Sequence, residues 1–388
     1  MDRLRNPYAP GAGRRPAALA GRTDELDVWE TALHRAAVGR TDRSVVLHGL
    51  RGVGKTVLLG EYLERAVARG WYVAHHEAGP GGDFRAAVAR SLYPSLRAAA
   101  RRGVGQRLRE ALATFRAFSV GVDTAGTWSF AVEVEPAHGR ADSGNLEFDL
   151  IELVVDLAGA AREAGTGVAL LLDEMQDLDA ATLAALCTAC HFAGQRNLPF
   201  LLGAAGLPSL PRVLSEARSY AERLFTYRPI APLSDAASRE ALTEPATAEG
   251  VTWHTDAMVH VTSAAGGYPY FLQEFGQATW RVADGDEITA DDARIGVAEG
   301  TRQLDAGFFR ARWDRATPGE RDYLRAMAVD GAGPSSSGEV AARLGKSHTS
   351  LGPVRAKLIG KGLVYAPEHG QIAYTVPGMA AFITRTPA

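Results

Sequence analysis

Short apolar runs alternate with longer amphipathic stretches over the first 230 residues of the chain. A strand that is buried on both faces of a sheet reads as a continuous apolar run, and such runs cover residues 44–48, 71–74, 168–172 and 198–208. The segments near these runs place apolar residues at helical spacing, namely residues 21–37, 57–69, 84–118, 148–164 and 180–195. This alternation predicts an α/β core built on a parallel sheet.

The pattern changes after Pro229 and Pro232, and it is helical from there to about residue 298. A chain of 388 residues is also too long for one ordinary domain. We therefore expect a flexible arm rich in Pro, Gly and Arg, an α/β core, a helical lid and a C-terminal domain, at residues 1–20, 21–230, 231–300 and 301–388.

One stretch inside the core has a different period. Apolar and small residues alternate over about residues 118–136 on both sides of a Thr-Ala-Gly-Thr turn, which predicts a β-hairpin insertion. The pattern assigns no function to this insertion.

The C-terminal domain begins with Thr317, Pro318 and Glu320, a capping box with proline at the first helical position. Two further helices, at residues 338–344 and 349–361, and a hairpin at residues 363–376 complete the pattern. A helix-turn-helix followed by a hairpin is typical of a DNA-binding winged helix, but winged helices also bind proteins. The third helix would present Ser347, His348, Ser350, Arg355 and Lys357.

Charge supports a polyanionic partner for this domain. Residues 301–388 carry 12 Lys and Arg against 7 Asp and Glu, a balance of +5, whereas the whole chain has a net charge of −3. A solvated surface with no such partner would have the same balance.

Composition excludes several classes of protein. The hydrophobic content of 46% and the charged content of 22% are globular values, and no apolar run is long enough to span a membrane. The N-terminus lacks the apolar stretch of a signal peptide, so we expect a cytoplasmic protein. Cys187 and Cys190 lie within a predicted helix without a second ligand pair, which favours ordinary packing over a metal or redox site.

The strongest chemical signal is the run Gly49-Leu50-Arg51-Gly52-Val53-Gly54-Lys55-Thr56, between a predicted strand and a predicted helix. It fits the P-loop pattern, in which glycines let backbone N–H groups face phosphates at a helix N-terminus. The lysine would reach the β- and γ-phosphates, and the threonine hydroxyl would bind Mg²⁺. We assign nucleotide binding to Gly49, Gly52, Val53, Gly54, Lys55, Thr56 and Val57.

A second motif follows the apolar run at residues 168–172. Asp173 and Glu174 stand at its carboxyl end, where open α/β sheets bind ligands. Asp173 would hold Mg²⁺ through water, and Glu174 would polarise the attacking water. The two motifs together predict a site for Mg·ATP.

The order of these motifs resembles the AAA+ and STAND-like ATPases, and in particular the origin-recognition-like, archaeal-type branch with a C-terminal winged helix. The resemblance extends from about residue 21 to 376. It implies that Arg22 lies in the segment beside the adenine, that Pro269 belongs to a Gly-x-Pro motif of the lid, and that Arg223 contacts the nucleotide of a neighbouring subunit.

Two departures from this family concern turnover. The run Gly203-Ala204-Ala205-Gly206 lacks the polar side chain that many relatives use to orient water, and Tyr270 stands near the usual place of an arginine that senses the γ-phosphate. Losing such groups slows hydrolysis by orders of magnitude. We therefore expect an ATP-binding switch with slow ATPase activity.

The sequence does not decide between two kinds of partner for this switch. Its nucleotide state would control a winged helix that binds duplex DNA. The alternative is a signalling scaffold that forms homo-oligomers on binding ATP and uses the winged helix to dock protein.

Overall fold

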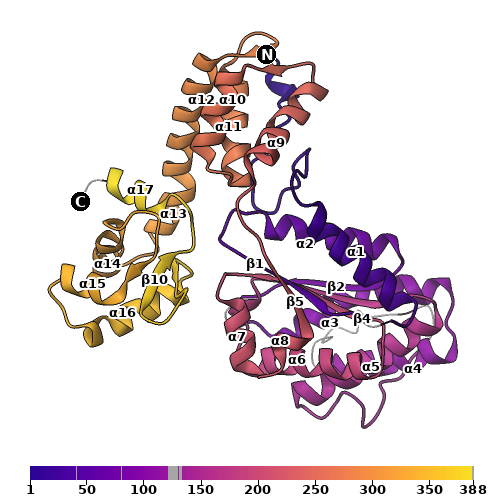
Figure 1. The fold of residues 1–388 in the computed structure, drawn as a ribbon. Coiled ribbons are helices and arrows are strands. Elements are labelled where there is room, and N and C mark those ends of the chain that lie inside the picture. Colours follow the sequence, from indigo (N-terminus) through magenta and orange to yellow (C-terminus); the bar gives the residue numbers. More distant parts are fainter. Residues whose placement is uncertain (41, 80, 121–129, 131–132, 387–388) are drawn as a thin grey trace.

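The computed structural model describes residues 1–40, 42–79, 81–120, 130 and 133–386. Three lobes meet at the middle of the molecule (Figure 1). The α/β core lies at the lower right, the helical lid at the top and the C-terminal domain at the left. Within the described residues, no helix is long and apolar enough to cross a membrane.

The core is a five-stranded sheet in the order β2-β3-β4-β1-β5, in which all neighbouring strands are parallel. This confirms the predicted α/β core. The strands span Ser44–His48 (β1), Tyr72–Glu77 (β2), Val168–Asp173 (β3), Phe200–Gly206 (β4) and Phe225–Pro229 (β5). β1 and β3 lie on either side of β4, so their carboxyl ends, with the P-loop and the acid pair, face the same edge.

Helices cover both faces of this sheet, which explains why β1, β3 and β4 are mostly apolar and buried along nearly their whole length. Trp29 of α1 (Thr23–Ala37) and Tyr62 of α2 (Lys55–Ala68) pack on one face with Val45 and Leu47 of β1. The other face is covered by α3 (Phe84–Arg102), α4 (Gln106–Phe118), α5 (Leu146–Glu163) and α6 (Ala180–Gln195). Two short helices, α7 (Leu210–Ala217) and α8 (Ala221–Leu224), and the 3-10 turn η2 (Met175–Asp177) complete the core.

Two expectations within the core are refined. The predicted helical stretch at residues 84–118 is two helices that separate at Gly103, and Phe118 ends the second of them. Most of the expected hairpin, residues 121–129 and 131–132, lies outside the described residues. Cys187 and Cys190 are free and buried in α6, as ordinary packing requires.

The lid consists of α9 (Asp235–Ala248), α10 (Thr255–Ala265), α11 (Pro269–Val282) and α12 (Ala290–Gln303), with the strand pair β6 (Thr252–Trp253) and β7 (Glu287–Ile288). Gly267, two residues before the start of α11, has a φ of 75°. A Cβ at this position would lie 2.4 Å from the Leu233 carbonyl oxygen, so only glycine fits here.

The N-terminal segment, residues 1–20, differs from the flexible arm that its composition predicts. It contains the 3-10 turn η1 (Arg3–Arg5) and packs against the lid (Figure 1). Tyr8 is 1% exposed, contacts Trp253 and Trp280 edge-on and donates a hydrogen bond to the Leu242 carbonyl. Burial of this aromatic ring with its hydroxyl satisfied holds the segment in place.

A continuous connector leads from the lid to the C-terminal domain. α12 passes through a π-helical stretch, η3 (Leu304–Phe309), into α13 (Arg310–Trp313). Three helices follow, α14 (Pro318–Ala328), α15 (Ser337–Arg343) and α16 (His348–Gly360), and α17 (Met379–Arg385) ends the described chain. A small antiparallel sheet has the order β8-β10-β9, with β8 at Ser335–Ser336, β9 at Val364–Tyr365 and β10 at Gln371–Tyr374.

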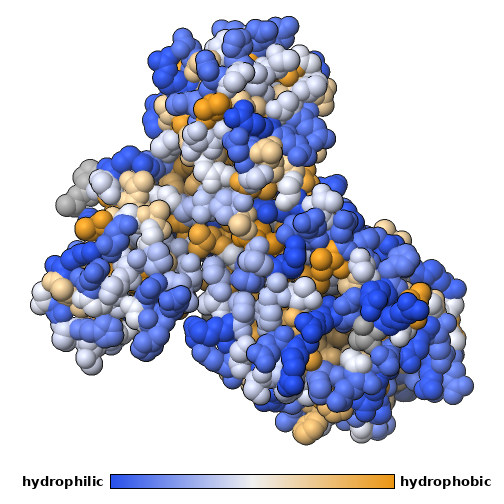
Figure 2. All heavy atoms as spheres, viewed as in Figure 1, coloured by the Kyte–Doolittle hydropathy of each residue, from blue (hydrophilic) through white to orange (hydrophobic). Residues whose placement is uncertain are grey.

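The space-filling view shows where the lobes join. Hydrophobic residues on this face gather in the middle of the molecule, where the three lobes meet, and the outer surfaces are mostly hydrophilic (Figure 2). The lid and the C-terminal domain share one buried cluster that includes Phe271, Phe309 and Phe382.

Candidate functional site

The loop after β1 has the backbone that a phosphate cradle needs. Gly52 and Gly54 have φ values of 85° and 95°, which favour glycine, and α2 begins at Lys55. Lys55 is buried, and its Nζ donates to the carbonyl oxygens of Gly49 and Leu50 at 2.9 and 2.8 Å. Burial lowers the pKa of Lys55 to about 8, against the opposing effect of the nearby Glu174 and Asp173 carboxylates.

Gly49 shapes the loop but is not among the described residues that line the cavity beside it. A Cβ at Gly49 would lie 2.3 Å from the Ile230 carbonyl oxygen, and that backbone is fixed because Ile230 N donates to His48 O. We expect Gly49→Ala to destabilise the protein by about 1–3 kcal/mol through overpacking. Urea unfolding measures this loss.

Gly60→Ala in α2 is the matched control, since a Cβ there would meet no described side chain or neighbouring element within 4 Å. Alanine in place of glycine in a helix interior should raise the free energy of unfolding by about 0.5–1 kcal/mol. Equal unfolding midpoints for Gly49→Ala and the wild type would contradict the close approach.

The acid pair lies across the end of β4 from this loop. Asp173 is buried, and its Oδ1 accepts a hydrogen bond from the Glu174 backbone N at 2.8 Å. Glu174 has a left-handed backbone, with φ of 48°, which is uncommon for a residue with a side chain and typical of functional sites. Arg51 Nη1 pairs with Glu174 Oε1 at 2.5 Å, and Gln176 Nε2 donates to Glu174 Oε2 at 2.7 Å.

Gln176 is a polar residue near the acid pair that sequence reasoning missed. Its Oε1 accepts the Leu207 backbone N at 2.9 Å, so it joins the ends of β3 and β4. A Cβ at Gly206 would lie 2.5 Å from this Oε1. The end of β4 is apolar, as expected. The polar side chain beside Glu174 is the Gln176 amide, which comes from η2 and not from β4. The run Glu174-Met175-Gln176-Asp177 was the available signal.

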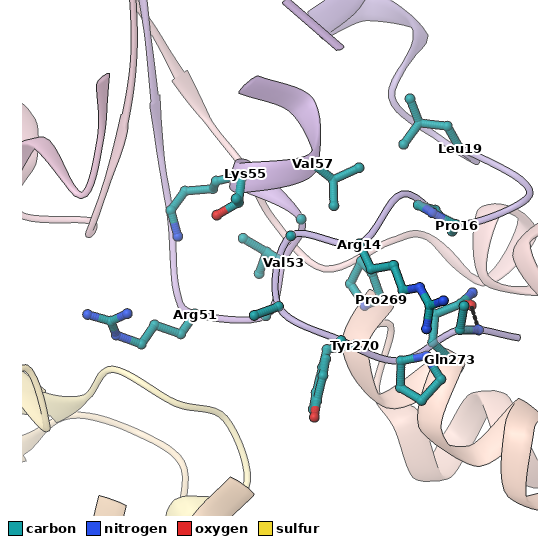
Figure 3. A pocket seen from close by; sticks show the side chains of 18 of the residues that line it. Arg14, Pro16, Leu19, Arg51, Val53, Lys55, Val57, Pro269, Tyr270 and Gln273 are labelled. Carbon is teal, nitrogen blue, oxygen red and sulfur yellow. Dashed lines mark hydrogen bonds between the residues drawn. The ribbon is translucent and has the colours of Figure 1, made fainter. Parts of the chain in front are cut away.

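The loop and the acid pair line a cavity of about 400 Å³ between the core, the lid and the N-terminal segment. Figure 3 shows Arg51 and Lys55 on one side of the loop and Tyr270 and Gln273 on the lid helix. The charged side chains that line this cavity are five cations and three anions, namely Arg14, Arg22, Arg51, Lys55 and Arg312, and Glu77, Asp173 and Glu174. The positive excess suits a polyanionic ligand.

The structure brings most of the predicted site residues together. Those that line the cavity are Arg22, Gly52, Val53, Gly54, Lys55, Thr56, Val57, Asp173, Glu174 and Pro269. Arg22 is also buried, and its Nη2 donates to the carbonyls of Val53 and Ala231 at 3.0 and 2.8 Å. It therefore ties the loop to the start of the lid.

Arg223 lies elsewhere. It is exposed on α8 and lines a different hollow together with Ser44 and Phe200, which begin β1 and β4. Those residues mark the edge of the sheet opposite the P-loop. Any role of Arg223 at a nucleotide would therefore require a neighbouring subunit.

The lid and the C-terminal domain both contact the P-loop. Tyr270 N donates to Gly52 O at 3.3 Å, and Arg51 N donates to Thr375 O at 2.9 Å. Arg51 thus contacts the C-terminal domain with its backbone and Glu174 with its side chain. Sequence reasoning missed this role, because Arg51 occupies a variable position of the P-loop pattern.

The N-terminal segment and the connector also supply cavity residues that the sequence did not predict. A Cβ at Gly13 would lie 3.0 Å from Thr56 Cγ2, so the segment runs directly beside the loop. In Figure 3, the side chains of Arg14, Pro16 and Leu19 lie on the side of the loop away from Arg51. From the connector come Phe308 and Arg312.

Comparisons of sequence with known families agree with this site. A family model described as an AAA ATPase domain matches residues 18–202, slightly less than half of the chain. A second model, a domain of unknown function (DUF8462), matches residues 306–383. No curated protein matches the sequence.

Solved structures show similarity in fold. The Walker-type ATPase PABY2304 of Pyrococcus abyssi has a TM-score of 0.59 at 17% identity, over 95% of this chain and 97% of that one. The Orc1 protein of Aeropyrum pernix, solved in complex with DNA, has a TM-score of 0.44 at 18% identity, over 96% and 94%. The Thermotoga maritima RuvB Holliday junction branch migration motor has 0.45 at 16% identity, over 93% and 96%. The chain therefore has the α/β fold of P-loop NTPases, and its residues 18–202 are similar in sequence to AAA ATPase domains.

Proposed function

We propose that this protein binds Mg·ATP in the cavity and hydrolyses it slowly, as a switch. The observation that carries the proposal is the placement of Lys55, on the P-loop, in one cavity with Asp173 and Glu174. The backbone N–H groups at the start of α2 would bind the phosphates. Pro269 and Arg22 would hold the lid and its linker against the bound nucleotide.

The residues present fit Mg²⁺ bound in the usual way of a P-loop. Within the described residues no group of three or more His, Cys, Asp or Glu side chains could hold a metal ion alone. Mg²⁺ is usually held by one or two protein ligands together with substrate phosphates and water. The Thr56 hydroxyl would supply such a ligand, and Asp173 would hold the ion through water. The ion would offset the charge of the phosphates.

Slow turnover follows from what surrounds Glu174. Arg51 Nη1 and Gln176 Nε2 each donate to one oxygen of the Glu174 carboxylate, so both compete with the water that a general base must contact. The end of β4 adds no polar side chain to orient that water. Phosphate release from ATP, measured with and without Mg²⁺, tests the proposed hydrolysis. Release that is independent of Mg²⁺ would contradict hydrolysis at this site.

We infer that the C-terminal domain is a winged helix that binds duplex DNA. Its order of α14, β8, α15, α16, β9 and β10 supports this reading. Lys346, His348 and Lys357 are exposed along and just before α16. Arg355 is held differently, because it donates to the Gln371 carbonyl of β10 at 3.1 Å.

The double variant Lys346→Ala, Lys357→Ala tests this interface in the full chain. We expect duplex affinity to fall by roughly tenfold at low salt, and the slope of log affinity against log salt to decrease by about 2, one for each lost phosphate contact. Arg294→Ala, on the exposed side of the lid, is the control. Wild-type protein that binds no duplex at low salt would contradict the interface.

The same titration with and without ATP tests whether the nucleotide controls the domain. The hydrogen bond from Arg51 N to Thr375 O gives the P-loop a direct connection to it. Identical affinities in the two titrations would contradict a switch.

The exposed position of Arg223 favours a second candidate, an ATP-dependent homo-oligomer that acts as a signalling scaffold. In such an assembly Arg223 would reach the nucleotide of the next subunit and act in catalysis there. Sedimentation with and without ATP separates this scaffold from a monomeric switch.

A further inference from the structure

The connector places one arginine at the nucleotide cavity. Arg312, on α13, lines the cavity together with Lys55, Asp173 and Glu174. Its guanidinium carbon lies 4.0 Å from the centre of the Phe308 ring, and Nη1 donates to the Phe308 carbonyl at 2.7 Å. Phe308 in turn stacks on Tyr270 of the lid, with ring centroids 4.8 Å apart.

Two residues on different elements, Phe308 of η3 and Tyr270 of α11, orient the Arg312 side chain through this stack. Phe308 lies in the π-helical stretch, and such stretches inside α-helices are frequent at functional sites. Tyr270, which stands near the usual place of a phosphate-sensing arginine, instead supports the ring on which Arg312 lies. The guanidinium is thereby held with few rotamers to lose on binding a ligand.

Within the described residues, Arg312 has no carboxylate partner. Its neighbour Arg310 pairs with Asp314 at 3.0 Å, whereas no ion pair in the described part of the chain involves Arg312. Burial and the nearby Arg51 lower the pKa of Arg312 to about 10, partly opposed by Tyr270 and Glu174. A partly buried guanidinium without an anion is unfavourable, and an arriving phosphate would satisfy it with two parallel hydrogen bonds.

We propose that Arg312 binds the terminal phosphate of the nucleoside triphosphate and makes the chain distinguish ATP from ADP. The proposal rests on the nucleotide binding proposed above. It assigns to the connector a contact that exists only while the γ-phosphate is present. Because α13 leads directly into the C-terminal domain, loss of that phosphate would release this domain from one of its ties to the site.

The test compares ATP and ADP affinities of the full chain, measured by calorimetry with Mg²⁺ present. We expect Arg312→Gln to weaken ATP binding by about tenfold or more, the effect of losing hydrogen bonds to a charged group. ADP affinity should stay within about twofold. Glutamine keeps a planar end over Phe308, and Arg312→Lys, which keeps the charge, should lose less than Arg312→Gln.

Arg310→Ala is the matched control on the same helix, and thermal melts check that each variant is folded. Equal losses for ATP and ADP would overturn the proposal, since they would show a structural role, and so would unchanged ATP affinity. Failure of the wild type to bind either nucleotide would instead contradict the proposed function.

Discussion

Lys55→Ala is expected to abolish measurable ATP binding. Lys55 is the buried cation of the P-loop and lies near Asp173 and Glu174. Truncating one partner of a buried charge pair costs roughly 2–5 kcal/mol, so the affinity should fall by about 10²-fold or more. Calorimetry with Mg·ATP measures the loss.

Arg212→Ala serves as the control, because it removes an exposed cation that pairs with Glu216 at 2.5 Å on the outside of the core. Lys55 also donates to the Gly49 and Leu50 carbonyls, so a thermal melt must show that the alanine variant is folded. A folded Lys55→Ala protein with undiminished affinity would contradict the assignment of the phosphate site.

Glu174→Gln should keep ATP binding and lose turnover. The amide has nearly the same shape as the carboxylate, but it cannot accept a proton from water. Loss of a general base costs typically 10²- to 10⁴-fold in rate. Single-turnover phosphate release, followed beside a binding titration on the same protein, separates the two effects.

Glu216→Gln is the matched control, since it makes the same change in the exposed ion pair with Arg212. Turnover equal to that of the wild type would show that Glu174 is not the base. A large loss of affinity would show that the carboxylate instead holds the site together.

The parts predicted best from sequence are those in which local pattern and burial agree. β1 and β3 are mostly apolar because helices cover both faces of the sheet, and that pattern is visible in the chain. The P-loop glycines and Lys55 were predicted for the same reason, since strand, turn and helix signals are contiguous there.

Features that depend on distant residues could not be predicted. Tyr8 fixes the N-terminal segment by contacts more than 200 residues away in sequence, with Leu242 and Trp253, while the segment's composition indicates flexibility. Arg312 reaches the P-loop cavity only because a π-helical stretch and a lid helix place it there. Arg22 was predicted beside the site from a family resemblance, but its hydrogen bonds to Val53 and Ala231 carry no sequence signal.

The proposed switch and the proposed role of Arg312 both depend on the binding of Mg·ATP in the cavity beside Lys55. Equilibrium calorimetry of the wild-type chain with ATP, in the presence of Mg²⁺ and again after EDTA is added, tests it most directly. We expect saturable binding of one ATP per chain that weakens when Mg²⁺ is removed. No heat of binding at millimolar ATP, with folded protein, would contradict it.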